Sequence, residues 1–354
     1  MRVLIATDAW EPQINGAVQT LSALASAAKK IGVEFVFLTP DEFLTIPLPS
    51  YATIRLALPP PGAIGRLIGA ANADAIHVAT EGPIGHAVRR YCLRHGLAYT
   101  TSFMTRFPDY VRMRTGIPEA WSWAYLRRFH GAAACVMVPT TMLAGELTEK
   151  GFRNVAVCPH GVDTQLFRPD SGKGLDVRRP IFLSVGRVAV EKNLQAFLSL
   201  DLPGSKIVVG DGPALKTFKQ QYSHVHFFGA LRGQALAEVY AAADVFVFPS
   251  RTDTFGLVLL EALASGVPIA AFPVQAPRDL LSASSVAVLD EDLRRACLRA
   301  LHISRHACRA FALDMSWNES VRRVLSNLRP AFSPQWVRSS AVASAAPLPS
   351  KPIL

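Results

Sequence analysis

The sequence predicts an α/β protein built from two doubly wound units, and three observations agree on this. Short apolar segments alternate with longer amphipathic ones along most of the 354 residues, which is typical of parallel sheets covered by helices on both faces. The alternation occurs twice, on either side of a segment at 169–179 that mixes proline, serine, glycine and charged residues like a linker. The length suits two hydrophobic cores better than one.

The first unit is expected to span 1–168. It begins with a strand at Val3–Ala6, followed by a polar loop, the Asn15-Gly16 pair and a helix over 17–30 that ends before Gly32. Further strands and helices alternate after it. The strands are expected at 33–38, 75–79, 98–103 and 135–138, and the helices at 85–95, 119–130 and 141–150.

The second unit is expected to span 180–312. Its predicted strands are 181–185, 206–209, 225–228, 245–248 and 268–271, and its predicted helices are 194–200, 233–242 and 257–265. After a last helix at 313–330, the residues 331–354 are rich in proline, alanine and serine without periodicity. We expect this tail to be disordered.

Polar residues and glycines gather in the loops that follow the predicted strands. Ligands of doubly wound sheets bind at the carboxyl ends of the strands, and two such units in one chain usually face each other. The sequence therefore predicts a cleft lined by the loops 8–16, 80–85, 102–106, 186–193, 210–213 and 249–257.

Composition limits the function classes. The formal charge of +10 favours anionic partners, but no nucleic-acid-binding motif is present, and we expect no nucleic acid partner. The five cysteines have neither C-x-x-C nor zinc spacing, so no metal site is expected. The start of the chain does not resemble a signal peptide, and no apolar run is long enough to span a bilayer. We therefore expect a cytoplasmic protein.

The most informative motif runs from Asp253 to Glu261, after the strand at 245–248. It is typical of a loop that leads into a helix, where the backbone amides of Phe255, Gly256 and Leu257 would be free to bind anionic or hydroxyl oxygens. Two acids eight residues apart can hold different parts of an extended, hydroxylated ligand. The structural alternative is that Asp253 caps the helix and Glu261 is solvated, although a carboxylate in so apolar a helix is costly.

This motif resembles the E-x7-E signature of the retaining GT-B glycosyltransferases of family four. Other segments match that family in order and spacing: Gly186-Arg187 with Glu191-Lys192-Asn193, Val209–Pro213, Ala243–Ser250 and Gly161–Asp163. The resemblance covers 2–328 and looks closest to bacterial mannosyltransferases and to the glycolipid and sulfolipid synthase-like branch. It implies two Rossmann-like domains facing a cleft, an acceptor domain first and a nucleotide-sugar donor domain second, with a C-terminal crossover helix (313–330) that returns to the first domain.

The resemblance also implies roles in holding the donor. Arg187 and Lys192 would neutralise its diphosphate, since fixed cations placed where charge develops act as an electrostatic catalyst. Asp253 would hold sugar hydroxyls and Glu261 the ribose hydroxyls. The family's donor site further includes Gly16, Gly186, Gly210, Leu231 and the amides of Phe255, Gly256 and Leu257. The structural alternatives are surface ion pairs for the two cations and an ordinary Asn-Gly turn at Gly16.

Two positions depart from the family pattern. Asp253 replaces the usual glutamate and is one methylene shorter. The segment 99–110 resembles a loop in which a histidine points at the sugar, but Met104 stands there and forms no useful hydrogen bond. The acceptor-side polar contact would then come from Thr105, Arg106 or Glu81, although a helix-capping role for Glu81 is equally consistent.

The helix expected at 119–130 gives a clue to the kind of acceptor. Trp121, Tyr125 and Phe129 recur every four residues and would share one side, and eight arginines lie between Arg89 and Arg128. One interpretation is a basic and aromatic surface that docks on an anionic membrane. The alternative is an aromatic stripe facing the core with solvated arginines.

Taken together, the residues and the resemblance predict a retaining, metal-independent hexosyltransferase without a cofactor. The donor would be GDP-mannose or a UDP-hexose, and the acceptor a hydroxyl, on a lipid or glycan, at the cytoplasmic face of the membrane. The alternative, motivated by Met104, is an attenuated scaffold that binds nucleotide sugar without efficient turnover. A dinucleotide-dependent oxidoreductase is disfavoured because the loop after the first strand lacks G-x-G-x-x-G.

Overall fold

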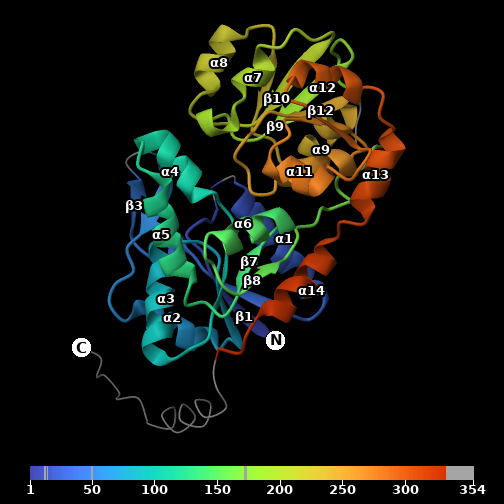
Figure 1. Cartoon of the computed structure of the whole chain (residues 1–354). Helices are drawn as coiled ribbons and strands as arrows, with labels where there is room; N and C mark the ends of the chain where they lie inside the picture. Colours follow the sequence, from blue (N-terminus) through green and yellow to red (C-terminus); the bar gives the residue numbers. More distant parts are fainter. Residues whose placement is uncertain (12, 14, 49–50, 171–173, 332–354) are drawn as a thin grey trace, which may run out of the picture.

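The computed structural model describes residues 1–354 except 12, 14, 49–50, 171–173 and 332–354, and it contains two domains (Figure 1). Each domain is built on a six-stranded parallel sheet, with the strand orders β2-β1-β5-β6-β7-β8 and β11-β10-β9-β12-β13-β14. The central strands are almost entirely buried, because helices cover both faces of each sheet. The predicted fold class is confirmed.

The first domain follows the predicted alternation with small shifts at the ends of elements. Sequence reasoning missed the antiparallel pair β3 (Thr45–Leu48) and β4 (Tyr51–Ala57) and four further elements, η1 (Pro40–Glu42), α2 (Ala63–Ala71), α4 (Phe107–Thr115) and β8 (Val155–Val157). The predicted elements are β1 (Arg2–Ala6), α1 (Gly16–Lys30), β2 (Glu34–Leu38), β5 (Ala75–Val78), α3 (Pro83–His95), β6 (Thr100–Ser102), α5 (Glu119–His130), β7 (Val136–Val138) and α6 (Thr141–Glu149).

The second domain has the same construction. Its unpredicted elements are α8 (Leu215–Gln221), α11 (Gln275–Leu281), β14 (Ala287–Leu289), α12 (Leu293–Ala300) and α13 (Arg305–Leu313). The turn η2 (Val190–Lys192) was also not predicted, since it lies in the loop expected at 186–193. The elements that were predicted are β9 (Ile181–Val185), α7 (Gln195–Leu198, within the helix expected at 194–200), β10 (Ser205–Val209), β11 (His226–Gly229), α9 (Gly233–Ala242), β12 (Val245–Phe248), α10 (Leu257–Ala264) and β13 (Ile269–Ala271).

The chain crosses between the domains twice. Helix α14 (Trp317–Asn327) returns to the first domain, as predicted, and its Val321 and Val324 share a core cluster with Leu21 and Leu24 of α1 (Figure 1). At the crossing, the amide of Val162 donates to the carbonyl of Met315 at 3.0 Å. A side chain at Gly161 would collide with the backbone of Trp317, so glycine allows the two segments to touch.

The expected tail begins one residue too early. Ala331 is buried, and its backbone pairs with that of Asp74 and Ala98. The rest of that prediction, 332–354, lies outside the described residues. Within the described part of the chain, no helix combines the length and the apolar character needed to cross a bilayer.

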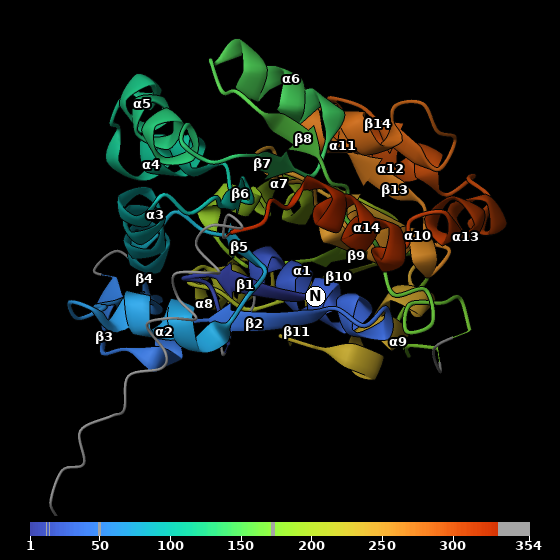
Figure 2. The same ribbon diagram turned by 90° about the horizontal axis from the view of Figure 1, so that it is seen from below.

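The aromatic stripe predicted on α5 is wrong in one of its members. Phe129 is buried in the core, whereas Trp121 and Tyr125 are 76% and 39% exposed. A spacing of four residues drifts around an α-helix of 3.6 residues per turn, and two turns of drift take Phe129 onto the core face. Trp123, which the stripe omitted, is buried instead. Helices α3, α4 and α5 lie together on one flank of the first domain (Figure 2).

Candidate active site

The order of strands locates the site. In each sheet the strand order reverses once, between β1 and β5 and between β9 and β12, and ligands bind in the crevice outside such a point. The loops after these four strands carry most of the predicted site residues. The domains meet there, because the hydroxyl of Thr254, after β12, donates to the carbonyl of Met104, after β6, at 3.0 Å.

Glycines let two loops of the second domain pack backbone against backbone. Gly210 has φ +144°, and a side chain there would lie 1.8 Å from the carbonyl oxygen of Gly186. Gly212 approaches the carbonyl of Val188 in the same way. This contact holds the segment that starts at Arg187 against the V-G-D-G-P turn. The role that the structure assigns to Gly210 is therefore close backbone approach.

The two predicted cations each lie next to an acid. The Nζ of Lys192 donates to Oδ1 of Asp253, and Arg187 Nη1 lies 3.8 Å from Oε1 of Glu191. The side chains of Lys192 and Asp253 are only 27% and 13% exposed, so this is not the weak surface ion pair that was the structural alternative. The ammonium of Lys192 and the carboxylate of Asp253 therefore lie in the same part of the site and can contact the same ligand.

One carboxylate oxygen of Asp253 has no hydrogen-bond partner among the described residues. This oxygen, Oδ2, is buried. A buried acceptor without a partner is uncommon and calls for a ligand or water. The capping alternative for Asp253 is wrong, because the N-cap of α10 is Gly256, at φ +80°, and no side chain caps the helix. The amide of Leu257, the first residue of α10, is thus free of any capping side chain.

Glu261 lies on α10 and is half-buried. The hydroxyl of the fully buried Tyr240 donates to its Oε2 at 2.8 Å, and burial raises the pKa of Glu261 to about 7. A solvated Glu261, the structural alternative, is therefore wrong. The remaining predicted donor residue, Leu231, lies two residues after the end of β11 and is partly buried against the core of the second domain.

On the first-domain side, Gly16 is the first residue of α1. The side chain of Asn15 caps this helix by accepting from the amide of Val18 at 3.0 Å. The pair Asn15-Gly16 is therefore a helix start and not a free turn. A side chain at Gly16 would meet no atom within 4 Å, so packing does not require glycine and open space lies beside this helix N-terminus.

Asp8 organises the opposite loops, and sequence reasoning gave it no role. Its carboxylate accepts hydrogen bonds from the amides of Ile84 and Gly85, at 2.7 and 3.2 Å, and from the hydroxyl of Thr80 at 2.9 Å. It thereby caps α3 from the loop after β1. Burial raises the pKa of Asp8 despite these bonds. The signal was its place after a buried strand, where the two loops at the point of strand reversal meet.

Two of the three polar candidates on the acceptor side, Glu81 and Arg106, are occupied by other partners. Oε1 of Glu81 lies 3.2 Å from Nε2 of the buried His130, and the cap of α3 is Asp8, so the capping alternative for Glu81 is wrong. The guanidinium of Arg106 donates to Asp109, to Glu146 of α6 and to Gln275 of α11 in the other domain. Arg106 therefore joins the two domains, and its hydrogen-bonding groups are engaged within the protein.

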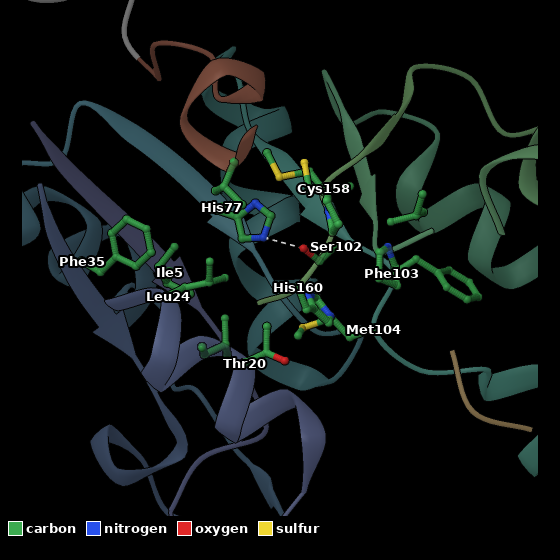
Figure 3. Close-up of a pocket in the computed structure, with 16 residues that line it drawn as sticks. Ile5, Thr20, Leu24, Phe35, His77, Ser102, Phe103, Met104, Cys158 and His160 are labelled. Atoms are coloured by element: carbon green, nitrogen blue, oxygen red, sulfur yellow. Dashed lines mark hydrogen bonds between the residues drawn. The ribbon is translucent and has the colours of Figure 1, made fainter. Parts of the chain in front are cut away.

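Met104 lines a cavity of about 30 Å³ at the carboxyl edge of the first sheet (Figure 3). His77 and Ser102 also line it. Both ring nitrogens of His77 have a hydrogen-bond partner: Nδ1 bonds Thr100 Oγ1 and Nε2 bonds Ser102 Oγ, both at 2.9 Å. Burial lowers the pKa of His77 to about 4.

His160 also lines this cavity (Figure 3). Sequence analysis did not single out either histidine. The signal for His160 was its position directly before the Gly161-Val162-Asp163 motif, where the chain leaves the first domain.

Family models match both domains. The model described as "Glycosyltransferase Family 4" matches residues 14–166, and the model described as "Glycosyl transferases group 1" matches residues 179–302. The two matches lie on either side of the predicted linker and together include the predicted cleft loops, except residues 8–13 of the first loop.

The chain is also similar to characterised proteins over most of its length. It is 29% identical to a GDP-mannose-dependent alpha-mannosyltransferase of Mycobacterium tuberculosis, over 80% of this chain and 82% of that protein. It is 25% identical to the alpha-monoglucosyldiacylglycerol synthase of Streptococcus pneumoniae, over 85% of this chain and 78% of that protein. Among solved structures, it superposes on sucrose-phosphate synthase from Thermosynechococcus elongatus with a TM-score of 0.69, covering 97% and 98% of the two chains at 18% identity.

Proposed function

The chain belongs to the glycosyltransferases of family four, and we propose that it transfers a hexose from a nucleotide-diphosphate sugar to a hydroxyl of a lipid or glycolipid. The observation that carries the donor assignment is the Lys192–Asp253 pair with its unused, buried carboxylate oxygen. A cation for the diphosphate and an acceptor for sugar hydroxyls then lie side by side. Similar proteins named for GDP-mannose and for a diacylglycerol product support the donor and acceptor classes.

The cations would do the electrostatic part of the chemistry. Charge develops on the leaving diphosphate as the glycosidic bond breaks, and Arg187 and Lys192 are positioned to stabilise it without reorganising. Gly16 and the amide of Leu257 add helix N-termini on the two sides of the cleft. We propose that no metal or other cofactor takes part in this step, because these groups supply the charge stabilisation.

We further propose that the reaction retains the anomeric configuration. The acceptor would approach from the face that the diphosphate leaves, and a phosphate oxygen of the leaving group would take the acceptor's proton. No protein base is then required, which is consistent with Met104 at the position of the family's histidine. Nothing in the site favours the alternative of an attenuated scaffold, since the cations and both acids of the donor motif are present.

A donor panel tests the proposed function. The protein would be incubated with UDP-glucose, UDP-galactose, UDP-glucuronate, UDP-N-acetylglucosamine, GDP-mannose, UDP or GDP, with melting temperature and sugar release as readouts. One nucleotide should raise the melting temperature by mass action, and its sugar nucleotide should be hydrolysed slowly. If millimolar concentrations of every nucleotide leave the melting temperature unchanged, the cleft is not a donor site.

The acceptor proposal rests on an exposed aromatic surface. We define the aromatic flank as Phe107, Ile117, Trp121 and Tyr125, which are 41%, 43%, 76% and 39% exposed on and between α4 and α5. Exposed arginines lie on the same two helices and on the neighbouring α3: Arg90, Arg94, Arg112, Arg127 and Arg128. Aromatic side chains flanked by cations favour the headgroup region of an anionic bilayer. We propose that the protein binds reversibly to such a surface, at the cytoplasmic face of the membrane.

Liposome flotation measures this binding. Vesicles with anionic lipid should float a larger fraction of the protein than neutral vesicles, and added salt should reduce that fraction. Trp121→Ala should weaken binding by about tenfold, since it removes the most exposed ring. Leu313→Ala, at a leucine that is 52% exposed on α13 of the other domain, should bind as the wild type does. Equal flotation with both lipid compositions would refute the membrane proposal.

A further inference from the structure

The side chain of His160 lies where three parts of the protein meet. Its ring packs edge-on against Phe255 of the donor loop, with 4.8 Å between centroids, and lies 6.0 Å from the ring of Trp317 on α14. It also shares the cavity with Met104 (Figure 3). His160 is therefore in contact with the loop proposed to bind the sugar and next to the position where the family carries a histidine.

The chemistry of His160 differs from that of the other histidine in the cavity. Burial lowers its pKa to about 4, so the imidazole is neutral near pH 7 and offers one donor and one acceptor. In the described part of the chain no hydrogen bond to either ring nitrogen of His160 is found, whereas both nitrogens of His77 are bonded. His160 is half-buried as a residue, and neither of its ring nitrogens is among the fully buried polar atoms that lack a partner.

We propose that His160 hydrogen-bonds a hydroxyl of the transferred sugar and so replaces the imidazole that position 104 lacks. The cavity of about 30 Å³ is too small for a hexose and large enough for water, so the sugar would lie above it, against Phe255 and Asp253. The thioether of Met104 fills the space beside the imidazole without competing for its hydrogen bonds. This inference rests on the proposed function.

A purely structural role makes a different prediction, and three substitutions separate the two. His160→Phe keeps an aromatic ring between Phe255 and Trp317 but removes both polar atoms. His160→Gln and His160→Asn lose the ring packing but retain a donor and an acceptor. If the ring only packs, phenylalanine should preserve activity and the amides should not; if it binds the sugar, the order should be reversed.

The expected result is specific to the sugar. His160→Phe should lower kcat/KM for the sugar nucleotide by about tenfold, the effect of leaving one hydroxyl without its hydrogen bond. The dissociation constant of the free nucleoside diphosphate should stay within about twofold of the wild-type value, because this ligand lacks the hexose that His160 is proposed to contact. His160→Gln or His160→Asn should retain more activity than the phenylalanine variant. His302→Phe, at an exposed histidine between α12 and α13, is the matched control and should behave as wild type.

A second imidazole provides the rescue. Met104→His in the His160→Phe background should recover part of the lost activity, because the side chains line the same cavity. Wild-type kcat/KM in His160→Phe would overturn the inference. So would equal losses of sugar-nucleotide and free-nucleotide binding. A wild-type protein that binds no nucleotide would instead refute the proposed function itself.

Discussion

Replacing Lys192 with alanine should lower kcat by about 30- to 1,000-fold, which corresponds to roughly 2–4 kcal/mol of barrier for the loss of one preorganised charge donor. Lys192 is proposed to stabilise the diphosphate as it leaves, and its ammonium is held in place by Asp253. Arg187→Ala should act in the same direction. The measurement is single-turnover transfer, or donor hydrolysis if the acceptor is still unknown.

Lys192→Ala should also affect the stability of the fold. Without Lys192, the largely buried carboxylate of Asp253 loses its cation, and an uncompensated charge of this kind destabilises the fold. Removing both partners, as Lys192→Met with Asp253→Asn, should therefore cost less stability than the sum of the two single changes. Lys219→Ala, at an exposed lysine on α8 of the same domain, controls for charge alone. Near-wild-type turnover in both Lys192→Ala and Arg187→Ala would mean that the diphosphate lies elsewhere.

Glu261→Gln should make the ligand-free protein more stable at pH 8 while weakening donor binding. Burial raises the pKa of Glu261 from 4.5 to about 7, so the folded state holds this proton more tightly than the unfolded state. The resulting stabilisation is complete below about pH 4.5 and is lost as pH rises through 7, since ∂ΔG/∂pH is negative where the folded state binds more protons.

The expected gain in the stability of Glu261→Gln follows from the shift in the pKa of Glu261. At 1.36 kcal/mol per pKa unit, and allowing for contact with the open cleft, the glutamine variant should gain roughly 2 kcal/mol at pH 8. Glutamine retains an acceptor for the hydroxyl of Tyr240. Melting temperatures of wild type and variant should converge near pH 4.5 and separate at pH 8. Glu291→Gln, at an acid whose side chain is 67% exposed, should show no such separation.

Donor binding should respond in the opposite sense. The carboxylate is proposed to accept hydrogen bonds from the ribose hydroxyls, and bonds to an ionised acceptor are the stronger ones. Glu261→Gln should therefore weaken nucleotide binding by about tenfold at pH 8. In the wild type the affinity should fall as pH drops below 7, and in the variant it should be flat over that range. Equal affinities at pH 8 would show that Glu261 does not contact the ribose.

Local patterns predicted more of the second domain's site than of the first domain's. The motif from Asp253 to Glu261 was found from its own residues and the segment around Lys192 from its resemblance to the family, and the structure brings Lys192 and Asp253 into contact. In the first domain, Asp8 was missed because its three partners lie more than 70 residues away. Arg106 and Glu81 were assigned to an acceptor, but their partners, Gln275 and His130, come from other elements.

The sequence by itself determined the two doubly wound sheets, the place of the cleft and the motifs of the donor loop. These features follow from periodicity and from residues that are neighbours in the chain, so they can be recognised without coordinates. Only the tertiary structure decided which side of α5 meets solvent, which acid holds which cation, and that Met104 and His160 share one cavity. Pairings of this kind join segments 50 to 170 residues apart, and the chain order of such segments does not specify their contacts until both sheets are packed.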